Sequence, residues 1–379
     1  MTKLVEPSQS ATQHAGAEQG PIRLADELDH LLGWINRHIF LPQPSVAALV
    51  ACWIANTYTY RNFRYCGYLS IQSATPRCGK TRLLEILSYT AKDRPPILTN
   101  PTAAVLYRGG WDVLLLDEVD KLRQQDRDAH GAVMAVLNSG FSEGGAVHRT
   151  EKTDDNKYEV VCHPVYGPKG LAGIEDLADT LADRCFTIRM ERASFRLPRL
   201  PRDFQEIATR IRQRFEQWAS SNAKMLKDCY TQLPNELPEL NGFDDRFQDI
   251  AEPLIVLAKT ADAERPDGPL ILPRMLEGLR AVAGRREPSE RERSLVVFLD
   301  IAERRLNGAG TVFVSSSDLV NDCMATYALA WIESPKALAS LLAPFDLKPG
   351  TTGQVRGYTL TREWVDKWRE RYSAGLEAA

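Results

Sequence analysis

Residues 73–81, SATPRCGKT, bring a glycine, a lysine and a hydroxyl together at a spacing suited to holding phosphate. They end like the phosphate-binding pattern G-x-x-x-x-G-K-S/T, but Ala74 stands where the pattern has its first glycine. In such a loop backbone amides face the phosphate oxygens, Lys80 bridges the outer phosphates and the Thr81 hydroxyl ligates magnesium. Alanine costs about 1 kcal/mol or more only where the backbone needs a positive φ. The departure weakens the pattern without excluding a phosphate site, and a chance match in an ordinary turn is the alternative.

Two acidic residues follow an apolar run further along the chain. In VLLLDEVD, residues 113–120, four apolar residues lead to Asp117 and Glu118. A carboxylate at the tip of a buried parallel strand can hold magnesium near phosphates, and its neighbour can act as general base toward water. Any buried strand can also end in solvated acids. Together with Lys80 and Thr81, however, the pair predicts an ATP-hydrolysing site with Lys80 and Glu118 as catalytic residues and Thr81 and Asp117 as metal ligands.

The elements that must position these groups alternate between strands and helices from residue 66 to about 192. The lysine-bearing loop follows an apolar strand and opens a helix, as the phosphate-binding mechanism requires. This alternation predicts an α/β fold with a mostly parallel sheet and helices on both faces. The expected short strands are residues 67–73, 95–99, 111–121, 170–174 and 185–190, with a strand pair in 146–165 and a capped helix at 102–108.

The pattern changes after residue 192, where a Pro- and Arg-rich connector leads into helices and then into a helix, helix, β-hairpin order. That order is typical of a winged helix. We expect a disordered tail (1–21), an N-terminal helical segment packing on the core (22–65), a nucleotide-binding core (66–193), a helical lid or connector (194–285) and a winged-helix-like domain (286–379).

Charge and cysteine content limit the function classes. The chain has 379 residues and a net charge of −3, so phosphate contacts must come from local basic patches. Its seven cysteines form no C-x-x-C pair, which argues against a disulfide framework or a zinc site and fits a reducing cytosol. The polar N-terminus lacks the apolar core of a secretory signal, and the apolar residues 46–55 are too few to span a bilayer. We therefore expect a cytoplasmic protein without membrane contact.

With both motifs in view, the chain resembles AAA+-type P-loop ATPases. More closely, LSIQSATPRCGKTRLLEIL, VLLLDEVD, LNSGFSEGGAVHR, PVYGPKGLAGI and DTLADRCFTIRM resemble the uncharacterised ATPase domain of phage and mobile-element primase–helicase chains. The resemblance covers roughly residues 24–372. It implies a P-loop NTPase fold, ATP and Mg²⁺ as cofactors, and activity on DNA in replication or maintenance of a mobile element. The matching loop residues expected to bind the nucleotide are Thr75, Pro76, Arg77, Cys78, Gly79, Lys80, Thr81 and Arg82.

The resemblance also assigns a role to Arg184. In AAA+ proteins an arginine near the end of the core reaches the ATP of a neighbouring subunit, and Arg184 matches that position. Its guanidinium can neutralise charge that develops on the terminal phosphate. This implies a homo-oligomer, with a hexameric ring as one arrangement, in which Arg184 acts in trans. A local ion pair with Asp179 or Asp183 is the alternative.

A second arginine, Arg246, starts a lid-like helix and could contact the same nucleotide. An ion pair with Asp245 or Asp249 explains it equally well. The polar sensor residue that the family carries after the fourth strand has no clear counterpart, because the strand is apolar up to Glu175.

Local basic features bear on DNA. The strand pair within 146–165 carries His148, Arg149, Lys152 and Lys157, and AAA+ helicases often track DNA with such a hairpin; an exposed mixed-charge hairpin is the alternative. Residues 189–214 contain eight arginines, which suits phosphate binding or a subunit contact but also a solvated connector. The expected winged helix offers the basic side chains Lys336, Lys348 and Arg356.

The sequence therefore predicts an ATP-hydrolysing AAA+-like motor that acts on DNA as a helicase or translocase, with DNA, further copies of itself and replication proteins as partners. The competing hypothesis is a nucleotide-gated protein-interaction module or regulatory ATPase that moves no DNA. A small-molecule kinase is a third reading, but it would not need Glu118 or the segments after residue 194.

Overall fold

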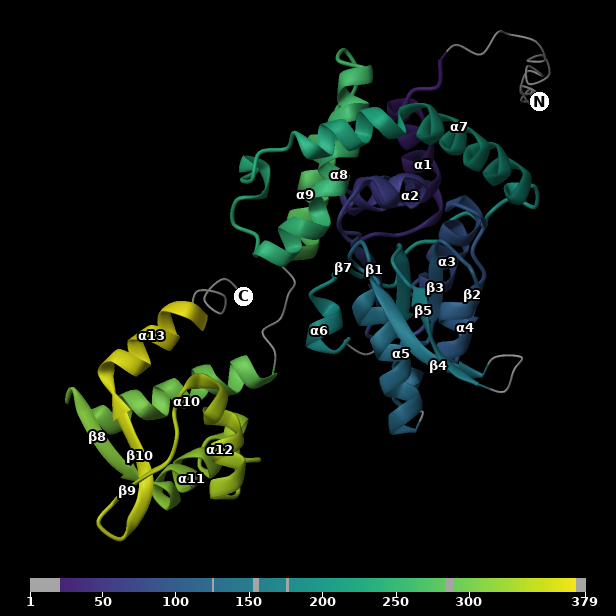
Figure 1. Cartoon of the computed structure of the whole chain (residues 1–379). Helices are drawn as coiled ribbons and strands as arrows, with labels where there is room; N and C mark the ends of the chain where they lie inside the picture. The colour runs from purple at the N-terminus through teal and green to yellow at the C-terminus, as the bar shows by residue number, and fades with distance from the viewer. Residues whose placement is uncertain (1–20, 125, 153–156, 175–176, 284–289, 373–379) are drawn as a thin grey trace, which may run out of the picture. The chain divides into compact units, whose positions relative to one another are not determined.

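Within the described residues, the first unit of the chain is built on five parallel strands (Figure 1). Their order across the sheet is β2-β3-β6-β1-β7. The strands are β1 (Tyr68–Gln72), β2 (Ile97–Thr99), β3 (Leu114–Asp117), β6 (Lys169–Gly173) and β7 (Cys185–Arg189). The expected α/β fold with a parallel sheet is confirmed. Because β6 lies between β1 and β3, the ends of those two strands are separated by two strand spacings, roughly 10 Å.

The structure is a computed structural model that describes residues 21–124, 126–152, 157–174, 177–283 and 290–372. The chain divides into two units, with the boundary between residues 285 and 286. The expected tail over residues 1–21 lies almost wholly outside the described residues.

Helices cover both faces of the sheet, and the alternation of side chains along each strand explains why. On β3, Leu115 packs in a core with Leu83 and Leu87 of helix α3 (Lys80–Thr90), whereas Leu114 and Leu116 belong to a separate core on the opposite face. Both cores are apolar, so each strand needs hydrophobic residues on both sides, as buried parallel strands do. The expected pair of helical layers is confirmed.

The helices of the first unit precede β1, alternate with the strands, or follow β7. They are α1 (Leu24–His38), α2 (Val46–Thr59), η1 (Tyr60–Asn62), α3 (Lys80–Thr90), α4 (Ala103–Arg108), η2 (Val119–Gln124), α5 (Arg127–Ser139), α6 (Asp179–Ala182), α7 (Phe204–Thr231), η3 (Pro238–Leu240), α8 (Asp245–Glu264) and α9 (Ile271–Ala283). The almost wholly apolar α2 packs against α1, α8 and α9, so it is buried on most sides, as its sequence predicts. The predicted cap Thr102 accepts a hydrogen bond from the Val105 amide at the start of α4.

The expected strand pair is present as an antiparallel hairpin of β4 (Ala146–Lys152) and β5 (Tyr158–Pro164). It forms its own two-stranded sheet beside the parallel one. Residues 153–156, between the two strands, lie outside the described residues.

A buried lysine lies where this hairpin returns to the main sheet. Lys169, the first residue of β6, is 1% exposed. Its ammonium donates to the carbonyls of Gly140, Val165 and Gly167 at 3.3, 2.9 and 2.9 Å, and it lies 4.7 Å from the centre of the Tyr68 ring. Burial lowers the pKa of Lys169 to about 7. The ammonium therefore ties the end of α5, the end of β5 and the start of β6 together, and no carboxylate of the described residues pairs with it.

The second unit carries its own apolar core. Its elements are α10 (Glu290–Leu306), β8 (Thr311–Ser315), α11 (Ser316–Met324), η4 (Tyr327–Leu329), α12 (Pro335–Leu342), η5 (Ala343–Phe345), β9 (Gly350–Thr352), β10 (Val355–Thr361) and α13 (Arg362–Tyr372). The expected hairpin is present as β9 and β10, and β8, which the sequence analysis did not anticipate, pairs with β10. Trp364 and Trp368 are buried in this core. The winged-helix assignment stays a prediction.

The three basic side chains noted for this unit are exposed: Lys336, Lys348 and Arg356. Over the part of the chain that the structure describes, every helix is too short or too polar to cross a bilayer.

Candidate functional site

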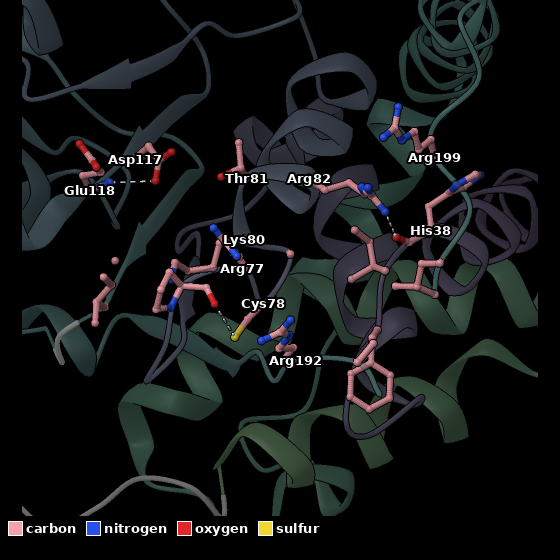
Figure 2. Close-up of a pocket in the computed structure, with 18 of the residues that line it drawn as sticks. His38, Arg77, Cys78, Lys80, Thr81, Arg82, Asp117, Glu118, Arg192 and Arg199 are labelled. Atoms are coloured by element: carbon pink, nitrogen blue, oxygen red, sulfur yellow. Dashed lines mark hydrogen bonds between the residues drawn. The ribbon is translucent and has the colours of Figure 1, made fainter. Parts of the chain in front are cut away.

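A cavity of about 760 Å³ lies where the lysine-bearing loop meets the end of β3 (Figure 2). Residues 76–82 of the loop and helix α3 line it, and so do Asp117 and Glu118. Two segments that are separated by more than thirty residues therefore share one cavity, although β6 keeps their strands apart. The remaining predicted site residues do not line it: Thr75, Arg184 and Arg246.

The loop is shaped by two residues with left-handed backbone conformation. Gly79, just before α3, has φ 94°, and Arg77 has φ 68°. A Cβ at position 79 would lie 3.3 Å from the Met190 side chain as well as straining the backbone, so glycine is required there. Ala74 is not among the described residues with positive φ. Its replacement of the usual first glycine is therefore free of the steric cost considered above, and the demand for positive φ falls on Arg77 instead.

Lys80 is held at the base of the loop by a neutral partner. Its ammonium donates a hydrogen bond to the Ser73 hydroxyl, which in turn donates to the Thr75 carbonyl at 2.7 Å. In the described part of the chain no carboxylate pairs with Lys80, so its positive charge is left for an anion. The sequence analysis gave no role to Ser73, which lies inside the motif but matches no fixed position of it.

The acidic side of the cavity is more elaborate than the sequence suggested. Asp117 accepts a hydrogen bond from the Glu118 amide at 2.9 Å, and Glu118 itself has φ 56°. The Glu118 carboxylate pairs with Lys121 at 2.7 Å. Asp120, which also lines the cavity, accepts from the Ile174 amide at 3.0 Å. Asp120 thereby places a carboxylate at the end of β6, where the sequence analysis found no polar sensor; Glu175 lies outside the described residues.

The opposite side of the cavity is basic. Three arginines of the segment after β7 line it: Arg192, Arg196 and Arg199. Figure 2 shows Asp117 and Glu118 on one side, Arg192 and Arg199 on the other, and the lysine-bearing loop between them. The eight-arginine segment was expected to serve DNA, a subunit contact or solvent, and no local pattern pointed to this cavity.

Arg82 fixes this basic segment to the rest of the site. Its guanidinium donates to the carbonyls of His38 and Pro198, both at 3.3 Å. The His38 ring nitrogen Nδ1 lies 3.2 Å from the same Pro198 carbonyl. The start of α3, the end of α1 and the segment after β7 are thus joined at the rim of the cavity.

The structure brings Arg184 and Arg246 together, but away from the cavity. Their guanidinium carbons lie 4.6 and 5.4 Å from the centre of the Phe141 ring. Burial, and then the nearby Arg246, lower the pKa of Arg184. Arg184 precedes β7, whereas the cavity lies beyond the strands' carboxyl ends, so the whole strand, roughly 16 Å of extended chain, separates the two. Neither guanidinium serves the cavity of its own chain in this conformation.

The donor set suits a metal that arrives together with phosphate. Among the described residues, no three His, Cys, Asp or Glu side chains form a metal cluster. Mg²⁺ is usually held by one or two protein oxygens, with phosphate and water oxygens completing its shell. The Thr81 hydroxyl and the Asp117 carboxylate, which line the same cavity, match that requirement.

Neither a protein-family model nor a curated protein sequence matches this chain. A solved structure described as the C-terminal region of NrS-1, in an apo A form, aligns over 91% of this chain and 77% of its own, with 11% identity and a TM-score of 0.42. At that identity and TM-score no conclusion about fold or function follows from it.

Proposed function

We propose that this chain binds Mg·ATP in the cavity between residues 76–82 and the end of β3, and hydrolyses it. One observation carries the proposal: a lysine at a helix N-terminus, which no carboxylate of the described residues pairs with, and two carboxylates from a distant strand line the same cavity. The lysine end suits phosphate oxygens, and the carboxylate end suits a metal ion and an attacking water. Arginines on the remaining side add to the attraction for a polyanion.

In this proposal the loop amides and Lys80 bind the phosphate chain and position it. Glu118 accepts a proton from a water whose oxygen attacks the terminal phosphorus, while the bond from that phosphorus to the bridging oxygen breaks and ADP leaves. Thr81 and Asp117 would hold Mg²⁺, which would supply positive charge beside the phosphate oxygens. Asp120 holds the acidic segment at the end of β6 through the Ile174 amide, whereas Lys121 pairs with the Glu118 carboxylate and must release it before Glu118 can accept a proton.

Calorimetric titration with Mg·ATP and a steady-state ATPase assay test this function. Lys80→Ala is expected to abolish binding, and Glu118→Gln to retain binding while losing turnover by about 10²-fold or more. Lys224→Ala, which removes an exposed lysine of α7, is the matched control and should behave as the unaltered protein. Failure of the unaltered protein to bind Mg·ATP would remove the proposal.

We further propose that the ATPase acts on DNA through the β4–β5 hairpin. Tyr158 and Val160 lie two residues apart on one face of β5 and are 71% and 70% exposed, so together they offer an apolar contact surface. Exposed aromatic rings can stack on the bases of single strands. Single-stranded DNA should therefore stimulate turnover, Tyr158→Ala should reduce that stimulation several-fold, and binding should weaken steeply with salt. If single-stranded DNA neither binds nor stimulates turnover, the result favours the competing hypothesis, a regulatory ATPase that moves no DNA.

The placement of Arg184 supports action on a second copy of the chain. Because a full strand separates it from its own cavity, it can approach a bound nucleotide only in a neighbour. Mixing Arg184→Ala with Lys80→Ala tests this, since one variant keeps an intact cavity and the other an intact arginine. Turnover above the sum of the separate proteins is expected; no gain in mixed oligomers would contradict action in trans.

A further inference from the structure

Arg77 combines an unfavourable backbone conformation with a place in the cavity. Its φ of 68° lies in the left-handed region, which is sterically unfavourable for a residue with a Cβ and favours glycine. Residues other than glycine with left-handed backbone conformations cluster at functional sites, because such strain persists only where the surrounding structure imposes it. Glu118, the proposed base, has φ 56° and lines the same cavity.

The Arg77 side chain has no competing partner. It is exposed, it lines the cavity, and among the described residues no carboxylate or carbonyl binds its guanidinium. Figure 2 draws it with Lys80 on the loop between the acidic and basic sides. Glycine would suit the backbone conformation at position 77 better than arginine. Because the Arg77 side chain is exposed, packing gives no reason for an arginine there either.

We propose that Arg77 is a further catalytic residue, which supplies from the same chain a guanidinium that binds the outer phosphates and neutralises the charge that develops as the terminal phosphate leaves. This inference rests on the proposed ATPase function. A guanidinium presents a planar fork that pairs with two phosphate oxygens, which the Lys80 ammonium cannot do. The contact strengthens as charge moves onto the bridging oxygen, so it favours the transition state over bound ATP. Turnover would then not depend wholly on an arginine from a neighbouring copy.

Arg77→Gly separates a catalytic role from a structural one, because only a catalytic role predicts that turnover falls while stability rises. Glycine relieves the left-handed strain, so the thermal midpoint should rise by roughly 2 °C. Turnover should nevertheless fall by about 10- to 10³-fold, with ADP affinity within about threefold of the unaltered protein. Affinity for ADP with aluminium fluoride, which mimics the leaving phosphate, should fall by the same factor as turnover. Arg77→Lys keeps the charge and the strain and should recover only part of the activity.

The matched control is Arg94→Gly. Arg94 is also an exposed arginine with positive φ, at 50°, but it does not line the cavity. Its replacement should change stability in the same direction without lowering turnover. If Arg77→Gly hydrolyses ATP as fast as the unaltered protein, the role of Arg77 is refuted while the ATPase function stands. If the unaltered protein does not bind Mg·ATP, both proposals are refuted together.

Discussion

Replacing the buried Lys169 by methionine should change how the stability of the protein depends on pH. The side chain is buried, no carboxylate in the described part of the chain pairs with it, and burial lowers its pKa from the usual 10.5 to about 7. A lysine with a lowered pKa in the folded state binds fewer protons than the same lysine in the unfolded chain between those two values. The free energy of unfolding of the unaltered protein should therefore rise as pH increases from about 7, and the penalty is fully present below that pH.

The magnitude follows from the same pKa. A lowering from 10.5 to about 7 corresponds to a charging penalty on the order of 5 kcal/mol at low pH. Between pH 7 and 8.5 one titrating group of this kind contributes roughly 1–2 kcal/mol of added stability. Methionine removes that contribution but also leaves the carbonyls of Gly140, Val165 and Gly167 without the ammonium, at about 1–3 kcal/mol for each group left unsatisfied. The absolute stability reflects both effects, whereas the pH dependence reflects the lysine alone.

Urea unfolding at pH 7 and at pH 8.5, at constant ionic strength, measures this difference. The difference in free energy of unfolding between the unaltered protein and Lys169→Met should change by roughly 1–2 kcal/mol, in favour of the unaltered protein, from pH 7 to pH 8.5. Cys66, the titratable neighbour, keeps its proton over this range because burial raises its pKa to about 12. Lys224→Met, at an exposed position, is the control and should show no such shift. Parallel pH dependences for Lys169→Met and the unaltered protein would refute the reasoning.

Three further predictions follow from single positions. Gly79→Ala should destabilise the protein by about 1 kcal/mol and weaken ATP binding at least tenfold in calorimetry, because its φ is 94° and the loop amides must face the ligand; unchanged affinity would contradict this. Lys121→Met should raise basal turnover by roughly two- to fivefold by freeing Glu118 from an ion pair at 2.7 Å, and a fall would show that Lys121 itself contacts phosphate. Leu115→Ala should lower the free energy of unfolding by about 2–5 kcal/mol in urea titrations, since Leu115 is fully buried in the sheet. A loss below about 1 kcal/mol would contradict this and would mean that neighbouring side chains fill the space left by the leucine.

The sequence by itself determined the local features of the site. The apolar run before residue 73, the Gly79-Lys80-Thr81 triplet and the acids after residue 116 each have a meaning within a few residues of chain, because strand burial, helix initiation and backbone conformation are local properties. The burial of α2 and the cap at Thr102 could be predicted for the same reason.

Only the tertiary structure decided which other groups share the cavity. Asp120 contacts the end of β6 because β6 lies beside β3, and Arg192 reaches the cavity because β7 runs beside β1. The sequence around each residue does not reveal these contacts. Arg184 and Arg246 meet on Phe141 through the packing of distant segments, and Lys169 is buried through contacts with chain brought in by the hairpin. Strand order and long-range packing depend on the whole chain at once, so short-range patterns of charge and hydrophobicity leave them open.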